Sequence, residues 1–413
     1  MTSQTSAPVK KRRVFYIPGY DPFPARRYRE LYRTESKEQA KISGYRIDIK
    51  GKGSGDARGW DVRSLIDGHM VDTSVDVLVW SDLVQHSMAQ DIPRTYWQLV
   101  KTSWIYITSG ALQRLMRLRK GPIIAALYPI GMLLLQLMLA LIAGDLISSL
   151  IHSGIAWILP DSIEWLIGFL TWPVFIVVAV VILRWFKEKD GWFFAHYLMH
   201  DYAYSAQHSG ETPGLLEVRM GEFREKIVRA LAEPLDEVLV VGHSSGAHLA
   251  VSVLADLLRE GTEHKPALAF LSLGQVIPMV SFLPKANVLR ADLKYLSAHP
   301  GLTWVDVSAP GDGCSFALCD PVAVTGVAPE DKRWPLVLSA AFTQSLTPEK
   351  WKELRWRFFR LHFQYLCAFD RPKDYDYFQI TAGPMTLAER YQDRAPSRSR
   401  IDVAASRYRS TAA

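Results

Sequence analysis

The stretch VLVVGHSSGAHLA, residues 238–250, decides the fold. Four apolar residues run into Gly-His-Ser-Ser-Gly, and an Ala- and Leu-rich segment follows. This pattern predicts a buried strand, a sharp turn and a helix, with Ser244 at the turn. Such a turn presents the serine hydroxyl at the amino end of a helix, where backbone N–H groups can stabilise an oxyanion. The alternative interpretation is a structural glycine-rich turn without chemistry.

Short apolar runs alternate with helical patterns on both sides of this stretch. The predicted strands are 14–17, 45–49, 75–80, 238–241, 267–273 and 303–308, and the predicted helices are about 25–42, 217–232, 246–259 and 286–299. Alternating strands and helices indicate an α/β fold with a mostly parallel sheet flanked by helices. In such sheets, functional sites gather at the carboxyl ends of the strands.

The sequence resembles the α/β-hydrolase family over two segments, roughly 14–80 and 217–380. The resemblance implies that Ser244 is the nucleophile and that the backbone N–H of Ser245 forms half of an oxyanion hole. The other half comes from a loop after an earlier strand, and FYIPGYDP at 15–22 offers Gly19 and Tyr20. Because no first two strands of the family precede Val14, we expect the sheet to be truncated at that edge.

An acid and a base are needed to activate the serine, and the family's chain order is Ser, Asp or Glu, then His. Asp306, Asp312 and Asp320 all lie in the segment 303–322. We favour Asp312 as the acid, because it lies just beyond the predicted strand in a Pro-Gly turn. Asp306 and Asp320 remain alternative acids, and their other interpretation is that of cap or turn residues. His362 is the single histidine downstream of Asp312, so it is the candidate base.

Four further histidines and one glycine-rich segment carry weaker signals. His243 and His248 flank the serine and are predicted to line a pocket or a helix surface. His196 and His200 are one helical turn apart, but Tyr197 stands where a zincin motif has Glu. KGKGSGDARG at 50–59 fails as a phosphate loop and is interpreted as a flexible loop. With three cysteines and no CxxC pair, the sequence predicts no metal site, no cofactor and reduced thiols.

Two uncharged runs, residues 121–144 and 165–183, are long enough to cross a bilayer. The alternative is a pair of buried helices in a soluble core. The connection at 145–164 lacks Lys and Arg, whereas both outer flanks are basic. By the positive-inside rule, we expect an inner-membrane protein with both flanks and both termini in the cytoplasm.

These features predict five segments along the 413-residue chain. They are a basic arm (1–13), the first part of an α/β-hydrolase domain (14–120), a transmembrane hairpin (121–183), the second part of that domain (184–384) and a basic, disordered tail (385–413). Anionic lipid accounts for part of the net charge of +6, and nucleic acid is not needed to explain it.

The sequence therefore predicts a membrane-anchored serine hydrolase that cleaves an ester or related acyl bond of a small-molecule or lipid substrate through an acyl-enzyme on Ser244. Acyl transfer is a second hypothesis, because it would use the same acyl-enzyme. A third is a catalytically silent membrane scaffold on a hydrolase fold. The sequence specifies no oligomeric state.

Overall fold

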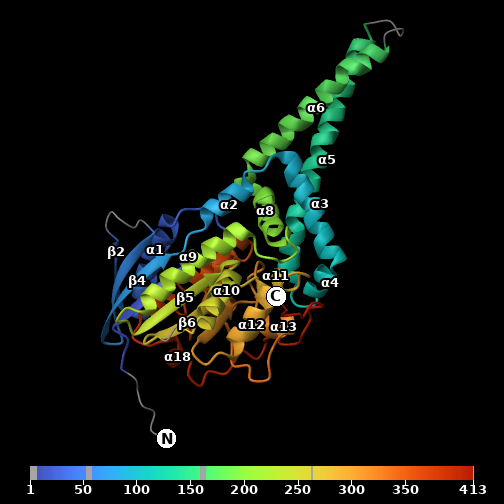
Figure 1. The fold of residues 1–413 in the computed structure, drawn as a ribbon. Coiled ribbons are helices and arrows are strands. Elements are labelled where there is room, and N and C mark those ends of the chain that lie inside the picture. Colours follow the sequence, from blue (N-terminus) through green and yellow to red (C-terminus); the bar gives the residue numbers. More distant parts are fainter. Residues whose placement is uncertain (1–6, 53–57, 159–163, 262–263, 413) are drawn as a thin grey trace. The chain divides into compact units, whose positions relative to one another are not determined.

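The computed structural model describes residues 7–52, 58–158, 164–261 and 264–412 (Figure 1). The chain divides into two compact units. Unit 1 comprises Met1–His86, Tyr106–Ile123 and His208–Ala413, and unit 2 comprises Ser87–Ile105 and Ile124–Gln207. The unit with the apolar helices is therefore larger than the predicted hairpin at 121–183, because residues 87–105 and 184–207 belong to it.

Unit 1 is built on an eight-stranded sheet in the order β2-β3-β4-β1-β5-β6-β7-β8. The strands are β1 (Lys11–Ile17), β2 (Arg46–Gly51), β3 (Gly59–Ile66), β4 (His69–Val77), β5 (Glu237–His243), β6 (Ala267–Leu273), β7 (Thr303–Ser308) and β8 (Leu336–Ser339). All pairs from β4 to β8 are parallel, and β2, β3 and β4 are joined by antiparallel pairing. The predicted α/β class with a mostly parallel sheet is confirmed.

Both faces of the sheet are covered, because its central strands are apolar on both sides. Alternate residues such as Val14, Leu239 and Val305 form one core with aromatic residues of α1 and α17. On the other face α10 packs against β5 and contacts α9 and α12 (Figure 1). These helices are α1 (Arg26–Ser43), α9 (Gly214–Leu231), α10 (Gly246–Arg259), α12 (Asn287–Ala298) and α17 (Tyr377–Ala382).

The remaining helices of unit 1 are short. One of them, α2, begins in unit 1 and ends in unit 2. They are α2 (Ser81–Met88), α4 (Ala111–Leu115), α11 (Ile277–Ser281), α13 (Pro321–Thr325), α14 (Phe342–Ser345), α15 (Pro348–Leu354), α16 (Phe358–His362), the 3-10 helix η2 (Phe363–Leu366) and α18 (Leu387–Arg390).

The expectation of a truncated sheet is wrong. β2 and β3 extend the sheet beyond β4, although both follow β1 in the sequence. Sequence reasoning missed β3, although polar and apolar residues alternate in GWDVRSLI, as suits an antiparallel strand with one exposed face. The basic arm also ends earlier than residue 13, since β1 begins at Lys11. Residues 53–57 of the predicted glycine-rich loop lie outside the described residues.

The predicted disorder of residues 385–413 is wrong for the part of this tail that is described, up to residue 412. It includes α18, whose Thr386 and Glu389 form a capping box. Ser397 N–H donates to the carbonyl of Val337, and Ala405 N–H donates to that of Val324. Backbone hydrogen bonds of this kind order a segment whose composition alone suggests disorder.

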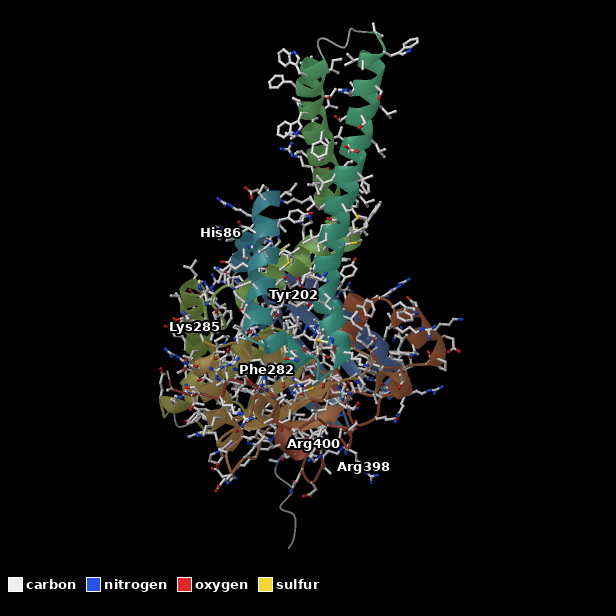
Figure 2. All side chains as sticks on the ribbon, turned by 90° about the vertical axis from the view of Figure 1, so that its right-hand side faces the viewer. His86, Tyr202, Phe282, Lys285, Arg398 and Arg400 are labelled. Atoms are coloured by element: carbon white, nitrogen blue, oxygen red, sulfur yellow. The ribbon has the colours of Figure 1, made fainter. Side chains whose placement is uncertain are left out.

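Unit 2 contains two long apolar helices, α5 (Lys120–Ala156) and α6 (Glu164–Glu188), which run side by side (Figures 1 and 2). Both are long and apolar enough to cross a membrane. In the most apolar 18-residue stretch of each helix, only 22% of α5 and 17% of α6 is buried. The side chains that project from these helices are mostly carbon (Figure 2). The alternative of two buried core helices does not fit this exposure. The helix α5 also extends through residues 145–156, which were predicted to connect the spans.

Three further helices pack within unit 2 near the N-terminal part of α5 and the C-terminal end of α6. They are α3 (Ile92–Thr108, which ends in unit 1), α7 (Asp190–Phe193) and α8 (Ala195–Ala206). Leu99 of α3, Leu133 of α5 and Met199 of α8 are buried together. The N-terminal part of α5 is therefore packed among helices of its own unit.

Two contacts fix the register between α5 and α6. A side chain on Gly144 would lie 2.9 Å from the carbonyl oxygen of Phe175, and Ser148 Oγ donates to the carbonyl of Thr171 at 3.0 Å. Extending this antiparallel register places the basic end of α6, at Arg184, level with residue 135 of α5. The apolar stretch 165–183 is therefore level with residues 136–154, whereas the predicted first span was 121–144.

Candidate active site

Ser244 occupies a strained turn between β5 and α10. Its backbone φ is 56°, in the left-handed region that non-glycine residues rarely adopt. Strain of this kind costs about 1–3 kcal/mol and persists only where the surrounding structure imposes it. Ser244 is only partly buried, while both neighbouring residues are buried. The turn thus presents one hydroxyl at the carboxyl edge of the sheet, as the sequence predicts.

Packing explains the two glycines that bracket the serine. A Cβ on Gly246 would overlap the carbonyl oxygen of Ile17 and lie 2.6 Å from that of Pro18. A Cβ on Gly242 would lie 2.8 Å from the Cα of Ala247. Gly246 therefore lets the turn fit against the end of β1, and Gly242 lets the strand approach the start of α10.

The predicted oxyanion residues lie beside the serine. A Cβ on Gly19 would be 2.9 Å from the Cβ of Ser244, so the loop after β1 passes directly over the turn. Tyr20 N–H donates to Ser245 Oγ at 3.0 Å. This bond already occupies the N–H of Tyr20, so of the two candidates in this loop Gly19 is the one we retain as an oxyanion donor. Ser245 is the N-cap residue of α10.

Asp312 and His362 form a buried pair. His362 Nδ1 lies 2.8 Å from Asp312 Oδ2, and both side chains are almost fully buried. Burial alone would raise the pKa of Asp312, but the charge of His362 and hydrogen bonds to the carboxylate outweigh it, so that the pKa is lowered. Asp312 is therefore ionised at neutral pH and holds the Nδ1–H tautomer of the imidazole.

The other ring nitrogen of His362 is available for chemistry. Nε2 is buried and has no hydrogen-bond partner among the described residues, so it makes no hydrogen bond with Ser244 here. The ring nevertheless lies next to the residue before the serine, because its centroid is 4.7 Å from that of His243. Bonds between a base and a nucleophile are often long without substrate and shorten when substrate binds.

The two alternative acids are placed elsewhere. Asp306 lies inside β7 and accepts a hydrogen bond from Ser272 Oγ at 2.6 Å. Burial raises its pKa to about 8. Asp320 caps α13 and pairs with Lys332 at 2.7 Å. Of the three aspartates, only Asp312 contacts His362 among the described residues.

Sequence reasoning missed two residues that support the pair. Tyr365 O–H donates to Asp312 Oδ2 at 2.9 Å and accepts from the N–H of Ala309. His243 Nε2 lies 3.0 Å from the carbonyl oxygen of His362. Burial lowers the pKa of His243 to about 3, with a contribution from His362, so His243 is neutral and Nε2–H can donate. No sequence pattern assigns either residue this role.

One group among the described residues could hold a metal ion. The ligand atoms of Asp312, Cys314 and His362 lie within 4.8 Å of one another. Because Asp312 and His362 already bond to each other, we assign no metal to this group, and the absence of a metal stays a prediction.

The histidine pair at 196 and 200 lies in α8 of unit 2. Both side chains are buried, and His200 Nδ1 lies 2.8 Å from Gln98 Oε1. Burial lowers both pKa values, that of His200 to about 4, so both rings are neutral. His248 of α10 is half-buried, and burial lowers its pKa to about 4 as well.

Comparisons with protein-family models, with curated proteins and with solved structures find no match to this chain. The geometry around Ser244 is therefore what indicates the function of this protein.

Proposed function

We propose that the protein is a membrane-anchored serine hydrolase of the α/β-hydrolase type that cleaves an ester or related acyl bond. One observation carries the proposal. A serine held in a left-handed strand-to-helix turn lies beside a buried Asp312–His362 pair whose outer nitrogen, Nε2, has no partner among the described residues. A glycine-rich structural turn requires none of these features around it.

The reaction begins when Ser244 Oγ attacks the acyl carbonyl carbon while His362 Nε2 takes the hydroxyl proton. Asp312 stabilises the resulting imidazolium, which returns the proton to the leaving alcohol. Backbone N–H groups of Ser245 and Gly19 stabilise the negative oxygen of the tetrahedral intermediate. A water molecule then attacks the acyl-enzyme, with His362 again acting as the base, and releases the acid and the free serine.

The order of the site residues along the sheet supports the hydrolase assignment. Ser244 follows β5, Asp312 follows β7, and His362 follows β8, so each comes after the carboxyl end of a parallel strand. This is the Ser, Asp, His order of α/β-hydrolases. The sheet departs from the α/β-hydrolase pattern at the β2 edge, because β2 and β3 follow β1 in the chain instead of preceding it.

The membrane anchor is the second part of the proposal. The exposed apolar side chains of α5 and α6 support insertion of the hairpin into a bilayer. By the positive-inside rule, the basic flanks support a location of unit 1 and both termini in the cytoplasm, at the inner membrane. A hydrolase held at this surface encounters lipid acyl groups at high local concentration.

Hydrolysis of a short-chain p-nitrophenyl ester by the detergent-solubilised protein tests the proposal. We expect turnover by the wild type and loss of turnover in Ser244→Ala, because the nucleophile is absent. Ser410→Ala, which changes an exposed serine, is the matched control and should keep full activity. If Ser244→Ala hydrolyses the ester as fast as the wild type, the proposed nucleophile is wrong. If the folded wild type gives no turnover, the scaffold hypothesis is favoured.

A further inference from the structure

The segment WKELRWRFFR at 351–360 leads directly into the catalytic histidine and exposes large aromatic side chains. Trp356 is 72% exposed and Phe358 is 48% exposed. Their rings meet edge to face, with centroids 6.4 Å apart, and the Arg355 guanidinium lies 5.5 Å from the ring of Trp356. A contiguous patch of large exposed aromatic side chains is typical of an interaction surface.

The same segment is strongly basic. Lys352, Arg355, Arg357 and Arg360 are all exposed. Glu353 is the one acidic residue of the segment and accepts hydrogen bonds from Arg357 and Arg360 at 3.1 and 3.2 Å. Residues 352–360, which we name the basic–aromatic rim, therefore carry a net charge of +3.

The rim is attached to the catalytic loop. A Cβ on Gly313 would lie 3.3 Å from the ring of Phe358, and one on Gly311 would lie 2.6 Å from the ring of Trp351. The loop that carries Asp312 is thus packed against aromatic residues of this segment on both sides. Phe358 also begins α16, the helix that ends at His362.

The start of α5 contacts the same loop within unit 1. A Cβ on Gly121 would lie 3.1 Å from the Cα of Gly313. Arg119, just before α5, donates to the carbonyl of Ala317 at 2.8 Å. The catalytic loop therefore lies between the rim and the first residues of the apolar helix.

We propose that the basic–aromatic rim binds the anionic surface of a lipid bilayer and directs the active site toward membrane lipids. Arginine recognises lipid phosphate groups, and Trp is favoured at the membrane–water interface. The positive charge of the rim complements anionic lipid, and the loop that the rim contacts also touches Gly121 at the start of α5. Resting on the proposed function, this inference names the substrate class as acyl esters of bilayer lipids.

Hydrogen exchange of the full chain tests the proposal in nanodiscs that each hold one copy. One set of discs contains only phosphatidylcholine, and the other has a third of it replaced by phosphatidylglycerol. We expect peptides within 352–361 to exchange at least about fivefold more slowly in the anionic discs, because a single cation near an anionic surface already strengthens binding by about that factor. In the triple variant R355Q/R357Q/R360Q this difference should disappear.

The triple variant R398Q/R400Q/R407Q is the matched control. It removes the same charge from exposed positions elsewhere on unit 1, of which Figure 2 labels Arg398 and Arg400. The lipid-dependent protection of 352–361 should persist in it. Equal exchange in both kinds of disc, or protection that survives in R355Q/R357Q/R360Q, would overturn the proposal and leave a protein partner as the occupant of the rim.

This measurement separates the inference from the function on which it rests. Exchange does not depend on turnover, so a protein that fails to hydrolyse esters can still show the lipid-dependent protection. Coelution of the chain with the discs reports insertion of the hairpin independently of the rim.

Discussion

Replacing Asp312 by Asn probes the Asp312–His362 pair, which we propose activates the serine. Asp312 Oδ2 accepts from both His362 Nδ1 and Tyr365 O–H, and Oδ1 accepts from the N–H of Cys314. The amide oxygen of the substituted side chain can keep the hydrogen bond from the N–H of Cys314. Its NH₂ group then faces His362 Nδ1–H and Tyr365 O–H, which are both donors. His362 would then have to present Nδ1 as the acceptor and carry its proton on Nε2, where it cannot take one from Ser244.

The expected loss in kcat is about 10³–10⁴-fold, or about 4–5.5 kcal/mol, as for the same change in other triads. The assay is p-nitrophenyl ester hydrolysis by purified protein, with circular dichroism to verify folding. Asp306→Asn is the matched control. Asp306 is buried and has a raised pKa, so it is largely protonated at neutral pH and its amide analogue should keep activity. If Asp312→Asn retains a tenth or more of the wild-type kcat, Asp312 does not orient the base.

Three further predictions concern packing, pH and membrane register. Gly246→Ala should destabilise unit 1 by about 1–3 kcal/mol in denaturant unfolding, because its Cβ meets the end of β1; unchanged stability would contradict the packing of the turn. The raised pKa of Asp306 means that the folded state binds more protons than the unfolded state between about pH 4 and 8, so its contribution to stability is present at low pH and is lost as pH rises toward 8. Asp306→Asn should abolish that decline, and a wild-type slope in the variant would refute the assignment. Asp145→Leu should improve insertion of α5 by about 3–4 kcal/mol in a translocon assay if residues 136–154 cross the bilayer, whereas no gain would favour the span at 121–144.

The central strands and helices could be predicted because local pattern and tertiary environment agree there. ALAFLSL forms β6 with the predicted bounds, and α10 spans Gly246–Arg259 as its apolar periodicity indicates. Strands β3 and β8 were not predicted. β8 has only four residues, too few to establish a period, so it depends on its neighbour in the sheet, whereas the polar–apolar alternation of β3 was a strand signal that sequence reasoning missed.

Long-range pairing explains the other differences. The register of α5 against α6 depends on Gly144 and Ser148 meeting residues of the other helix, which hydropathy along one helix does not encode. The C-terminal tail is ordered by hydrogen bonds to residues that lie far earlier in the chain. Arg119, one of the basic residues that flank the first predicted span, donates to a backbone carbonyl of unit 1.

The site was predictable to the extent that chain order and chemistry limited the choice. His362 is the single histidine downstream of Asp312, and the structure brings these two residues together. The supporting roles of Tyr365 and His243 were not predictable, because they arise from packing between η2, the end of β5 and the loop after β7.

Covalent labelling with a fluorophosphonate tests the central claim most directly. The reagent reacts with a serine hydroxyl only when a base and an oxyanion hole activate it. Tryptic mass spectrometry of the labelled, detergent-solubilised protein should find the adduct on Ser244, and Ser244→Ala should remain unlabelled while Ser410→Ala is labelled like the wild type. A folded protein that gives no adduct, or an adduct on another serine that persists in Ser244→Ala, would contradict the account.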